Sequence, residues 1–349
     1  MKVDRGILAA VSASILFGLS TPLAKTFVGS ISPLLLAGML YLGSGVGLTA
    51  LLILRTVAGG RESVTWPQGV DLWWLLGAIA AGGVIGPYLL MYGLRATDAA
   101  SASLLLNIEG VFTALLAWFV FKENFDRRIA AGMALIIAGG LALSIGSTVR
   151  VGGLVGSLAI TGACLAWAID NNLTRKVSVH DAMFIACSKG LVAGATSVAV
   201  ATAFGAELPT TTTMLRVGLL GFIGYGLSLT LFVVALRRLG TARTGAYFSL
   251  APFFGAALAV TLGAPFGPML MLSGLLMGAG VWLHLTERHE HWHRHHYMTH
   301  THPHVHDEHH QHDHETESDV NGSHSHPHVH EILEHTHSHY PDIHHHHDH

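Results

Sequence analysis

The sequence predicts an all-α polytopic membrane protein, with ten transmembrane helices arranged as two inverted five-helix repeats and followed by a disordered histidine-rich tail. Three observations predict this. Half of the 349 residues are apolar and only 12% are charged, against roughly 25% charged residues in a soluble domain. Apolar segments of about 20 residues, long enough to cross a bilayer as a helix, recur through the first 286 residues. Of the 27 histidines, all except His180 and His284 lie after residue 288, which leaves 25 in the last 61 residues.

Charged residues and turn-forming residues separate the apolar segments. Examples are Gly59-Gly60-Arg61-Glu62, Lys122-Glu123-Asn124 and Arg175-Lys176. Glycine and polar clusters of this kind interrupt helices. The expected spans are residues 6–26, 32–54, 72–94, 99–121, 128–147, 152–172, 182–204, 214–236, 242–263 and 267–286.

Lysine and arginine are distributed unevenly between the two sides of this arrangement. If the N-terminus is cytoplasmic, Lys25, Arg95, Arg150 and Arg216 lie outside and Lys189 lies within a span, so 14 of the 19 basic residues are cytoplasmic. Such an excess marks the cytoplasmic side of a membrane protein. We therefore expect a multi-pass protein of the cell (cytoplasmic) membrane, surrounded by the lipid bilayer, with both termini in the cytoplasm.

Two sequence matches indicate an internal duplication. Residues 17–25 (FGLSTPLAK) match residues 167–175 (WAIDNNLTR), and at a second offset Leu94-Arg95 matches Leu236-Arg237. Each half then has five spans, and an odd number inverts the second half in the membrane, as in many alternating-access transporters. The expected domains are residues 1–147, 148–286 and 287–349.

The first helix of each half has an aromatic residue, a small residue, three further residues and then Pro22 or Asn172, and Lys122-Glu123 closes the fourth span. With two five-span halves, these features resemble the EamA-like branch of the drug/metabolite transporter superfamily over residues 1–286. The resemblance implies secondary transport, commonly export, through a central cavity lined by both halves. Two positions depart from the repeat: Ala264-Pro265 stand where the first half has Lys122-Glu123, and Glu109-Gly110 stand where the second half has Ala251-Pro252.

Ionisable residues inside the expected spans are candidates for the transport pathway, because charge is costly in a membrane. Glu109 lies near the middle of the fourth span, so it must be protonated, paired or facing a wet cavity. A wet cavity would suit proton coupling or cation binding, whereas the simpler alternative is a protonated glutamate bonded to a neighbouring helix. Asn107, two residues earlier, points elsewhere on the same helix.

Asp170, Asn171 and Asn172 end the sixth expected span and offer oxygen ligands for a hard cation or a polar substrate. Solvation of a helix end near the cytoplasm is the alternative explanation. Lys189 would either extend to the cytoplasmic face or pair with Glu109 or Asp170. Four tyrosines within spans are candidates for lining the cavity or for packing: Tyr88, Tyr92, Tyr225 and Tyr247.

The tail is dominated by a His-x-His pattern with interleaved acidic residues, and it has too few apolar residues to form a core. Neutral imidazole suits Zn, Ni and other transition metals. Alternate histidines share a side of an extended chain, and a flexible chain can wrap several of them around one ion. We therefore expect several weak-to-moderate sites for divalent Zn, Ni or Co, with no cofactor otherwise required. The candidate ligands are His289, His291, His293, His300, His302, His304, His306, His324, His326, His328, His330, His335, His337 and His339.

These features predict a secondary transporter, with two alternatives for its substrate. The first is export of Ni, Co or Zn, with the tail capturing or sensing the metal and Glu109 coordinating it or coupling it to protons. The second is export of an amino acid or metabolite, with a regulatory or metal-buffering tail. A membrane-anchored metal store or sensor is a third hypothesis. The sequence has neither a nucleotide-binding loop nor an HExxH motif, so we expect no enzyme activity, and we expect no nucleic-acid partner.

Overall fold

The protein was analysed as a computed structural model. The structure describes residues 5–57, 67–121, 127–146, 151–178, 180–286, 290–294, 298–304, 324–330 and 334–338. They belong to two compact units, a helical unit within residues 1–287 and a tail unit within residues 288–340.

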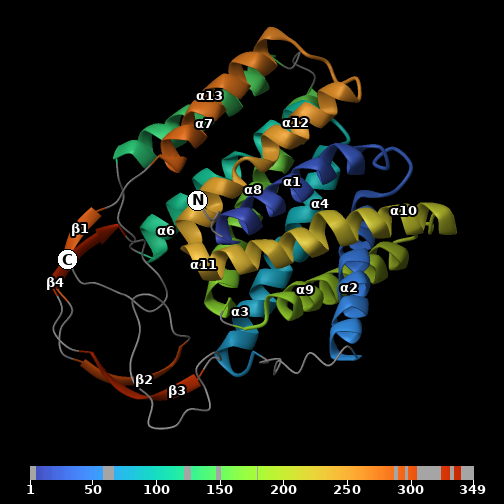
Figure 1. Cartoon of the computed structure of the whole chain (residues 1–349). Helices are drawn as coiled ribbons and strands as arrows, with labels where there is room; N and C mark the ends of the chain where they lie inside the picture. The colour runs from blue at the N-terminus through green and yellow to red at the C-terminus, as the bar shows by residue number, and fades with distance from the viewer. Residues whose placement is uncertain are drawn as a thin grey trace. The chain divides into compact units, whose positions relative to one another are not determined.

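The helical unit is built from long apolar helices (Figure 1). Of the described residues, eight helices are long and apolar enough to cross a membrane, and shorter apolar stretches at Ala130–Leu143 and Pro268–Leu283 occupy the two remaining expected spans. The helices are α1 (Arg5–Lys25), α2 (Pro33–Val57), α3 (Val70–Ala78), π-helix η1 (Ile79–Ile85), α4 (Gly86–Gly93), α5 (Ala99–Leu105), α6 (Ile108–Phe121), α7 (Arg127–Gly146), α8 (Val151–Val177), α9 (Ala182–Ala203), α10 (Thr211–Gly221), π-helix η2 (Phe222–Leu227), α11 (Ser228–Phe248), α12 (Ala251–Thr261) and α13 (Pro268–Leu285).

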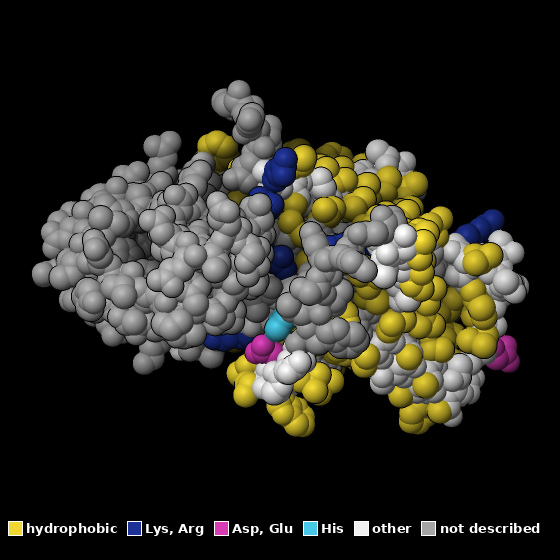
Figure 2. Space-filling view, turned by 60° about the horizontal axis from the view of Figure 1, so that its bottom comes forward, with side chains coloured by type: hydrophobic (Ala, Val, Ile, Leu, Met, Phe, Trp, Pro, Cys, Tyr) yellow, Lys and Arg dark blue, Asp and Glu magenta, His cyan; other side chains and the backbone are white. Residues whose placement is uncertain are grey.

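Large apolar side chains cover much of the outer surface of this unit, as Figure 2 shows. Among them, Leu215 is 71% exposed, Leu275 is 66% exposed and Trp282 is 65% exposed. Apolar surface of this extent is typical of a face that contacts lipid, whereas a soluble monomer exposes only small apolar patches. The exposed surface therefore agrees with a multi-pass membrane protein.

The helix interruptions repeat along the chain at spacings of 142 or 143 residues, which match the 142 residues between Leu94 and Leu236. The π-helix η1 ends at Ile85 and η2 ends at Leu227. In the fourth span, α5 and α6 are separated by Leu106-Asn107, and the ninth span is broken after Phe248, before α12. Both kinds of irregularity thus occur at equivalent positions, which supports the duplication inferred from the sequence.

The helix α11 contains the end of the eighth span and the start of the ninth. Leu239 lies beside Gly6, near the start of α1, whereas the ring of Phe248 stacks on Phe17 with centroids 5.4 Å apart. A carbonyl atom of Ala251 lies beside Gly18. The chain therefore runs along α1 in one direction up to Leu239 and runs back in the other direction by Phe248. The expected change of direction between the eighth and ninth spans lies between Leu239 and Phe248, although both residues belong to α11.

Corresponding helices of the two halves pack against each other in opposite directions. On α2, Gly38 contacts Ser197 of α9 and Gly45 contacts Gly190, so residue numbers rise on one helix as they fall on the other. The helices α7 and α13 also pair, with Gly139 beside Ser273 and Gly280 beside Gly132. A two-fold axis that relates two antiparallel helices is perpendicular to both of them. For helices that cross a membrane, this axis lies in the plane of the membrane. The packing therefore agrees with inverted repeats.

The tail unit contains four short strands: β1 (Glu290–Arg294), β2 (Met298–His304), β3 (His324–His330) and β4 (Glu334–Ser338). They form two antiparallel pairs, β1 with β4 and β2 with β3. The expectation for the tail was an absence of regular structure. The pairing has a physical basis in the His-x-His pattern, because alternation with a period of two is the periodicity of a strand.

Candidate functional site

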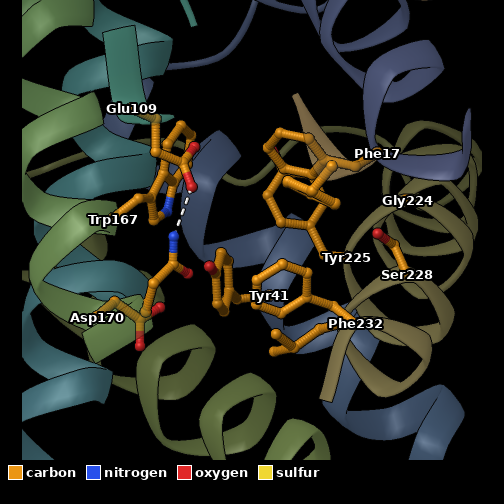
Figure 3. Close-up of a pocket in the computed structure, with 12 residues that line it drawn as sticks. Phe17, Tyr41, Glu109, Trp167, Asp170, Gly224, Tyr225, Ser228 and Phe232 are labelled. Carbon is orange, nitrogen blue, oxygen red and sulfur yellow. Dashed lines mark hydrogen bonds between the residues drawn. The ribbon is translucent and has the colours of Figure 1, made fainter. Parts of the chain in front are cut away.

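A cavity lies at the centre of the helical unit and is lined by both halves of the chain (Figure 3). The space open to the centres of water-sized molecules is about 50 Å³, enough for a few waters. Much of its wall is aromatic, and α6 and α8 supply its carboxyl and amide groups. The lining residues are Phe17, Tyr41, Glu109, Trp167, Asp170, Asn171, Gly224, Tyr225, Ser228, Leu229, Phe232 and Phe248.

Glu109 reaches the cavity from the first turn of α6, just after the break in the fourth span. Its Oε1 accepts a hydrogen bond from Nδ2 of Asn171 on α8, with a distance of 2.7 Å, and Figure 3 draws this bond. Among the described residues, no basic side chain forms an ion pair with Glu109. The carboxyl group thus faces the cavity with one neutral partner from the opposite half.

Asp170 also faces the cavity, but its charge is matched. The Nζ of Lys189 on α9 donates to Oδ1 and Oδ2 of Asp170 at 2.5 and 2.7 Å, and Thr174 Oγ1 donates to Oδ1 at 2.8 Å. Lys189 is 1% exposed and Asp170 is 5% exposed. Of the two partners considered for Lys189, the structure selects Asp170, and the lysine does not reach the surface.

This arrangement argues against one of the two explanations offered for Asp170 to Asn172, solvation at a helix end, because Asp170 and Asn172 are buried. The sixth span does not stop at residue 172, since α8 continues to Val177. The continuation has a physical cause: Thr174 lies one turn beyond Asp170 and bonds to its carboxylate, so the polar residues of this turn satisfy one another inside the protein.

The π-helix η1 supplies a backbone acceptor next to these groups. The carbonyl oxygen of Gly82 accepts from Tyr41 Oη at 2.7 Å and from Trp167 Nε1 at 3.0 Å. A Cβ at position 82 would lie 1.9 Å from Asp170 Oδ2, so only glycine permits this approach. Because a π-helix bonds residue i to i+5, it shifts carbonyl groups out of the regular helical pattern. This bulge therefore fixes the orientation of two cavity-lining rings.

Aromatic rings form a contiguous cluster in another part of the wall. Phe17 is at the centre, with ring centroids 5.7 Å from those of Trp167 and of Tyr225 in edge-to-face geometry. Tyr225 lies 5.3 Å from Tyr41. The faces of such rings carry partial negative charge and attract cations. The cavity thus combines a carboxyl group with several cation-attracting surfaces.

Several candidates from the sequence lie outside this cavity. Tyr88 and Tyr92 are 37% and 41% exposed and contact each other, with centroids 6.2 Å apart. Tyr247 packs beside an apolar cluster at Ala9, Ala10 and Leu239. Two buried asparagines bond locally: Asn107 Nδ2 donates to Leu104 O at 3.2 Å, and Asn172 Nδ2 donates to Ala168 O at 2.8 Å. Of the four tyrosines, only Tyr225 lines the cavity.

Sequence reasoning did not select most of the aromatic wall. Phe17 and Trp167 occupy equivalent positions in the match between residues 17–25 and 167–175, so the duplication contained a signal for them. An aromatic residue repeated at the first helix of both halves is expected near the axis that relates the halves. Tyr41, Phe232 and Phe248 have no such signal, because their positions depend on tertiary packing.

The chain matches the EamA-like transporter family over residues 4–145 and 154–286. The chain belongs to this family. The two matched segments correspond to the two repeats, and the match ends before the histidine-rich tail. The identification confirms the resemblance inferred from the sequence and establishes a multi-pass membrane transporter fold built from two repeats.

Similar proteins are transporters by description. The chain is 29% identical over 293 residues to an uncharacterized transporter of Methanothermobacter thermautotrophicus, covering 80% of this chain and 85% of that protein. It is 28% identical over 295 residues to a probable amino-acid metabolite efflux pump of Salmonella typhimurium, covering 79% and 93% of the two chains. A crystal structure with 19% identity matches with a TM-score of 0.62 over 80% of this chain and 95% of the other, which supports the fold.

The candidate metal ligands of the tail are divided between described and undescribed residues. His289, His306 and His339 lie outside the described residues. The others lie in the four strands of the tail unit. Among the described residues of the helical unit, no group of three His, Cys, Asp or Glu side chains is arranged to hold a metal. The cavity of the helical unit therefore has no assembled metal centre among the residues described.

Proposed function

We propose that this EamA-family transporter exports a small organic solute that carries an ammonium group, such as an amino acid or an amine derived from one. The observation that carries the proposal is the carboxyl group of Glu109, which faces an aromatic cavity and has a single described hydrogen-bond partner, the neutral amide of Asn171. A carboxylate inside a membrane protein requires a counter-charge or a proton. A cationic solute in the cavity, or a coupling proton when the solute is absent, supplies it.

The charges around the cavity support a single cationic group. Lys189 balances Asp170 at 2.5 Å, so this pair contributes little net charge. Glu109 then leaves one negative charge to be neutralised. The rings of Phe17, Trp167 and Tyr225 stand close together around the cavity. They would add cation–π attraction to an ammonium group and apolar contact to its carbon skeleton.

The direction of transport rests on two further supports. The Salmonella relative is described as an efflux pump. The distribution of basic residues favours cytoplasmic termini, which would present the tail to the cytosol where an exported solute is collected. Export from the cytosol across the cell membrane is therefore the direction we propose.

Export of Ni, Co or Zn is the second candidate, and it is favoured by the histidine-rich tail alone. Transition-metal sites in proteins normally use several nitrogen, sulfur or oxygen ligands around one ion. Among the described cavity residues, Glu109, Asp170 and Asn171 supply carboxyl or amide oxygen atoms, and the other side-chain oxygens are hydroxyl groups. Asp170 is already bonded to Lys189 and Thr174. This donor set suits an organic cation better than a transition metal.

Substrate flux in proteoliposomes tests the proposal. Counterflow of radiolabelled basic, neutral and acidic amino acids and of simple amines is compared for the wild-type protein, Glu109→Gln and Glu207→Gln. We expect Glu109→Gln to lower flux of the preferred cation-bearing solute about ten- to a hundredfold, the equivalent of one hydrogen bond to a charged group. Glu207 is exposed on the loop before α10, so Glu207→Gln removes the same charge without touching the cavity.

The same liposomes distinguish the two candidates. Zn, Ni and Co flux is measured for the full chain and for a truncation after Glu287. Metal flux that survives truncation and is abolished by Glu109→Gln would replace the proposal with metal export. If Glu109→Gln transported the solute as fast as the wild type, Glu109 would not recognise the solute, and the proposal would be wrong.

A further inference from the structure

The register of the tail strands places histidines directly opposite one another. In the β2–β3 pair, His300 faces His328, His302 faces His326 and His304 faces His324. In the β1–β4 pair, His291 faces His337 and His293 faces His335. Each of these opposed pairs is called a histidine rung below. A shift by one residue in either pair would place histidine opposite a different residue type at every rung, whereas the observed register matches histidine with histidine.

Alternation along a strand then gathers the rungs on one face of each ribbon. Residues 300, 302 and 304 are two apart, as are residues 324, 326 and 328, so all six positions lie on the same face of the β2–β3 ribbon. The four histidine positions of the β1–β4 ribbon share a face for the same reason. Neighbouring rungs are about 7 Å apart along the strands.

The prolines fit this register independently of the histidines. Pro303 faces Ser325 and Pro327 faces Thr301, so both lie on the rungs between the histidine rungs. Rungs of an antiparallel ladder alternate between pairs that exchange two N–H···O bonds and pairs that exchange none. Proline has no N–H and fits the second kind. The histidine rungs are therefore the hydrogen-bonded ones, with Cα atoms about 5.5 Å apart.

We propose that each ribbon binds a divalent transition-metal ion between its strands, with ligands from two consecutive histidine rungs. The four positions His291, His293, His335 and His337 make one such set. His302 and His326, together with an adjacent rung, make the second. Four neutral imidazoles in a compact square of positions can satisfy tetrahedral Zn, with Zn–N distances of about 2.0–2.1 Å.

This inference changes the expected character of the tail and does not depend on the transported solute. Local His-x-His units would bind metal separately, whereas rungs require both strands of a ribbon for every ion. The strands β2 and β3 are separated by the chain between His304 and His324, so an ion between them joins distant segments of the tail. Metal binding would then stabilise the ribbon, since only the paired strands present the complete ligand set.

Zn binding by the full-length protein in detergent, measured by isothermal titration calorimetry, tests whether the sites are shared. One variant replaces His300, His302 and His304 by Ala, a second replaces His324, His326 and His328, and a third combines all six changes. If ions bridge the strands, each single-strand variant loses as many bound ions as the combined variant. If each strand binds metal alone, the losses add, and the proposal is overturned. The matched control replaces His309, His310 and His312, which removes three histidines outside the rungs; a loss equal to that of the strand variants would also overturn it.

A distance measurement tests the register itself. Nitroxide labels are attached at Thr299→Cys with Val329→Cys, which face each other, or at Thr299→Cys with Ser325→Cys, four residues out of register. These positions lie between the histidine rungs, so the labels leave the ligands intact, and the two native cysteines are buried. We expect diamagnetic Zn to increase dipolar broadening of the continuous-wave EPR spectrum strongly for the first pair and much less for the second. Equal broadening, or no effect of Zn, would contradict a metal-bridged ribbon.

Discussion

Two helix contacts are equivalent in the two repeats: α6 packs against α8, and α12 packs against α1. Only the α6–α8 contact contains an ionisable side chain at the position compared here. On the first, Glu109 accepts a bond from Asn171. At the repeat spacings of 142 and 150 residues, their counterparts are Ala251 and Thr21. The helix break precedes both Glu109 and Ala251, so the backbone is shared while the side chains differ.

The same difference extends to the helices beside the π-bulges. Gly82 of η1 lies against Asp170, and its counterpart Gly224 of η2 lies against Ser20, the residue equivalent to Asp170. The duplicated fold thus places two equivalent sets of helices around one cavity. The first frame consists of η1, α6 and α8, and the second frame consists of η2, α12 and α1. Of these positions, only those in the first frame hold carboxyl groups, at Glu109 and Asp170. An inverted repeat needs matching backbones to exchange conformations, whereas the cationic solute proposed above would need only one counter-charge, so its recognition would not require the two sets of side chains to match.

Replacing Lys189 should have the largest effect, because it breaks the charge balance on the polar side of this comparison. Lys189→Met leaves the Asp170 carboxylate buried with only Thr174 as a described donor. Removal of one partner from a buried ion pair costs about 3–5 kcal/mol. We expect a correspondingly large fall in the free energy of unfolding in detergent.

The double variant Lys189→Met with Asp170→Asn is the control for that measurement, since it removes both charges together. Recovery of most of the lost stability would assign the effect to the unpaired carboxylate. A single variant as stable as the wild type would mean that Asp170 does not depend on Lys189, and that the two carboxyl groups of the cavity are not distinguished by pairing.

Glycine substitution in the two π-bulges should have a smaller effect that is unequal between the halves. A Cβ at Gly82 would lie 1.9 Å from Asp170 Oδ2, whereas a Cβ at Gly224 would lie 2.5 Å from Ser20 Cβ. Overpacking costs about 1–3 kcal/mol. We expect Gly82→Ala to lower the free energy of unfolding by about 3 kcal/mol, because Lys189 holds Asp170 in place. We expect Gly224→Ala to lower it by about 1 kcal/mol.

Thermal unfolding of the two glycine variants, with solute flux measured in parallel, checks this order. Gly82→Ala should also reduce flux, because it displaces the backbone carbonyl that orients Tyr41 and Trp167. Equal losses in the two variants would mean that the ion pair does not make the first frame more rigid than the second.

The contrast between the halves also marks what the sequence could and could not predict. Hydropathy and repeat matching predicted the ten spans and the inversion, because burial of apolar helices in lipid leaves few alternatives. Glu109 was identified for the same reason, since an acid in an apolar span is conspicuous. The pairing of Lys189 with Asp170, and the closing of the wall by Phe232 and Phe248, depend on which helices meet. That information resides in tertiary packing and not in local pattern.

Local pattern was also insufficient for the helix irregularities. No residue of Ile79–Ile85 signals a π-helix, and glycines are frequent along the whole chain. In the tail the reverse holds: the two-residue alternation that suggested metal binding is also a strand periodicity, but the low apolar content led to the prediction of a disordered tail.

Pro252 provides the smallest effect and a test of what produces the shared helix break. Its counterpart is Gly110, and the fourth span breaks before Glu109 without a proline. There the turn is closed by i to i−3 bonds, from Glu109 N to Leu106 O at 3.1 Å and from Gly110 N to Asn107 O at 3.2 Å.

Proline is therefore not required for the break in the fourth span, and we expect the equivalent break in the ninth span to form without it as well. Pro252 lies in the first turn of α12, where a backbone N–H has no helical acceptor in any case. We expect Pro252→Ala to change the free energy of unfolding by about 1 kcal/mol or less and to leave solute flux nearly unchanged. A loss of flux in Pro252→Ala as large as the loss expected for Glu109→Gln would mean that the helix break in the ninth span requires its proline. The two frames would then differ in the cause of the helix break as well as in charge.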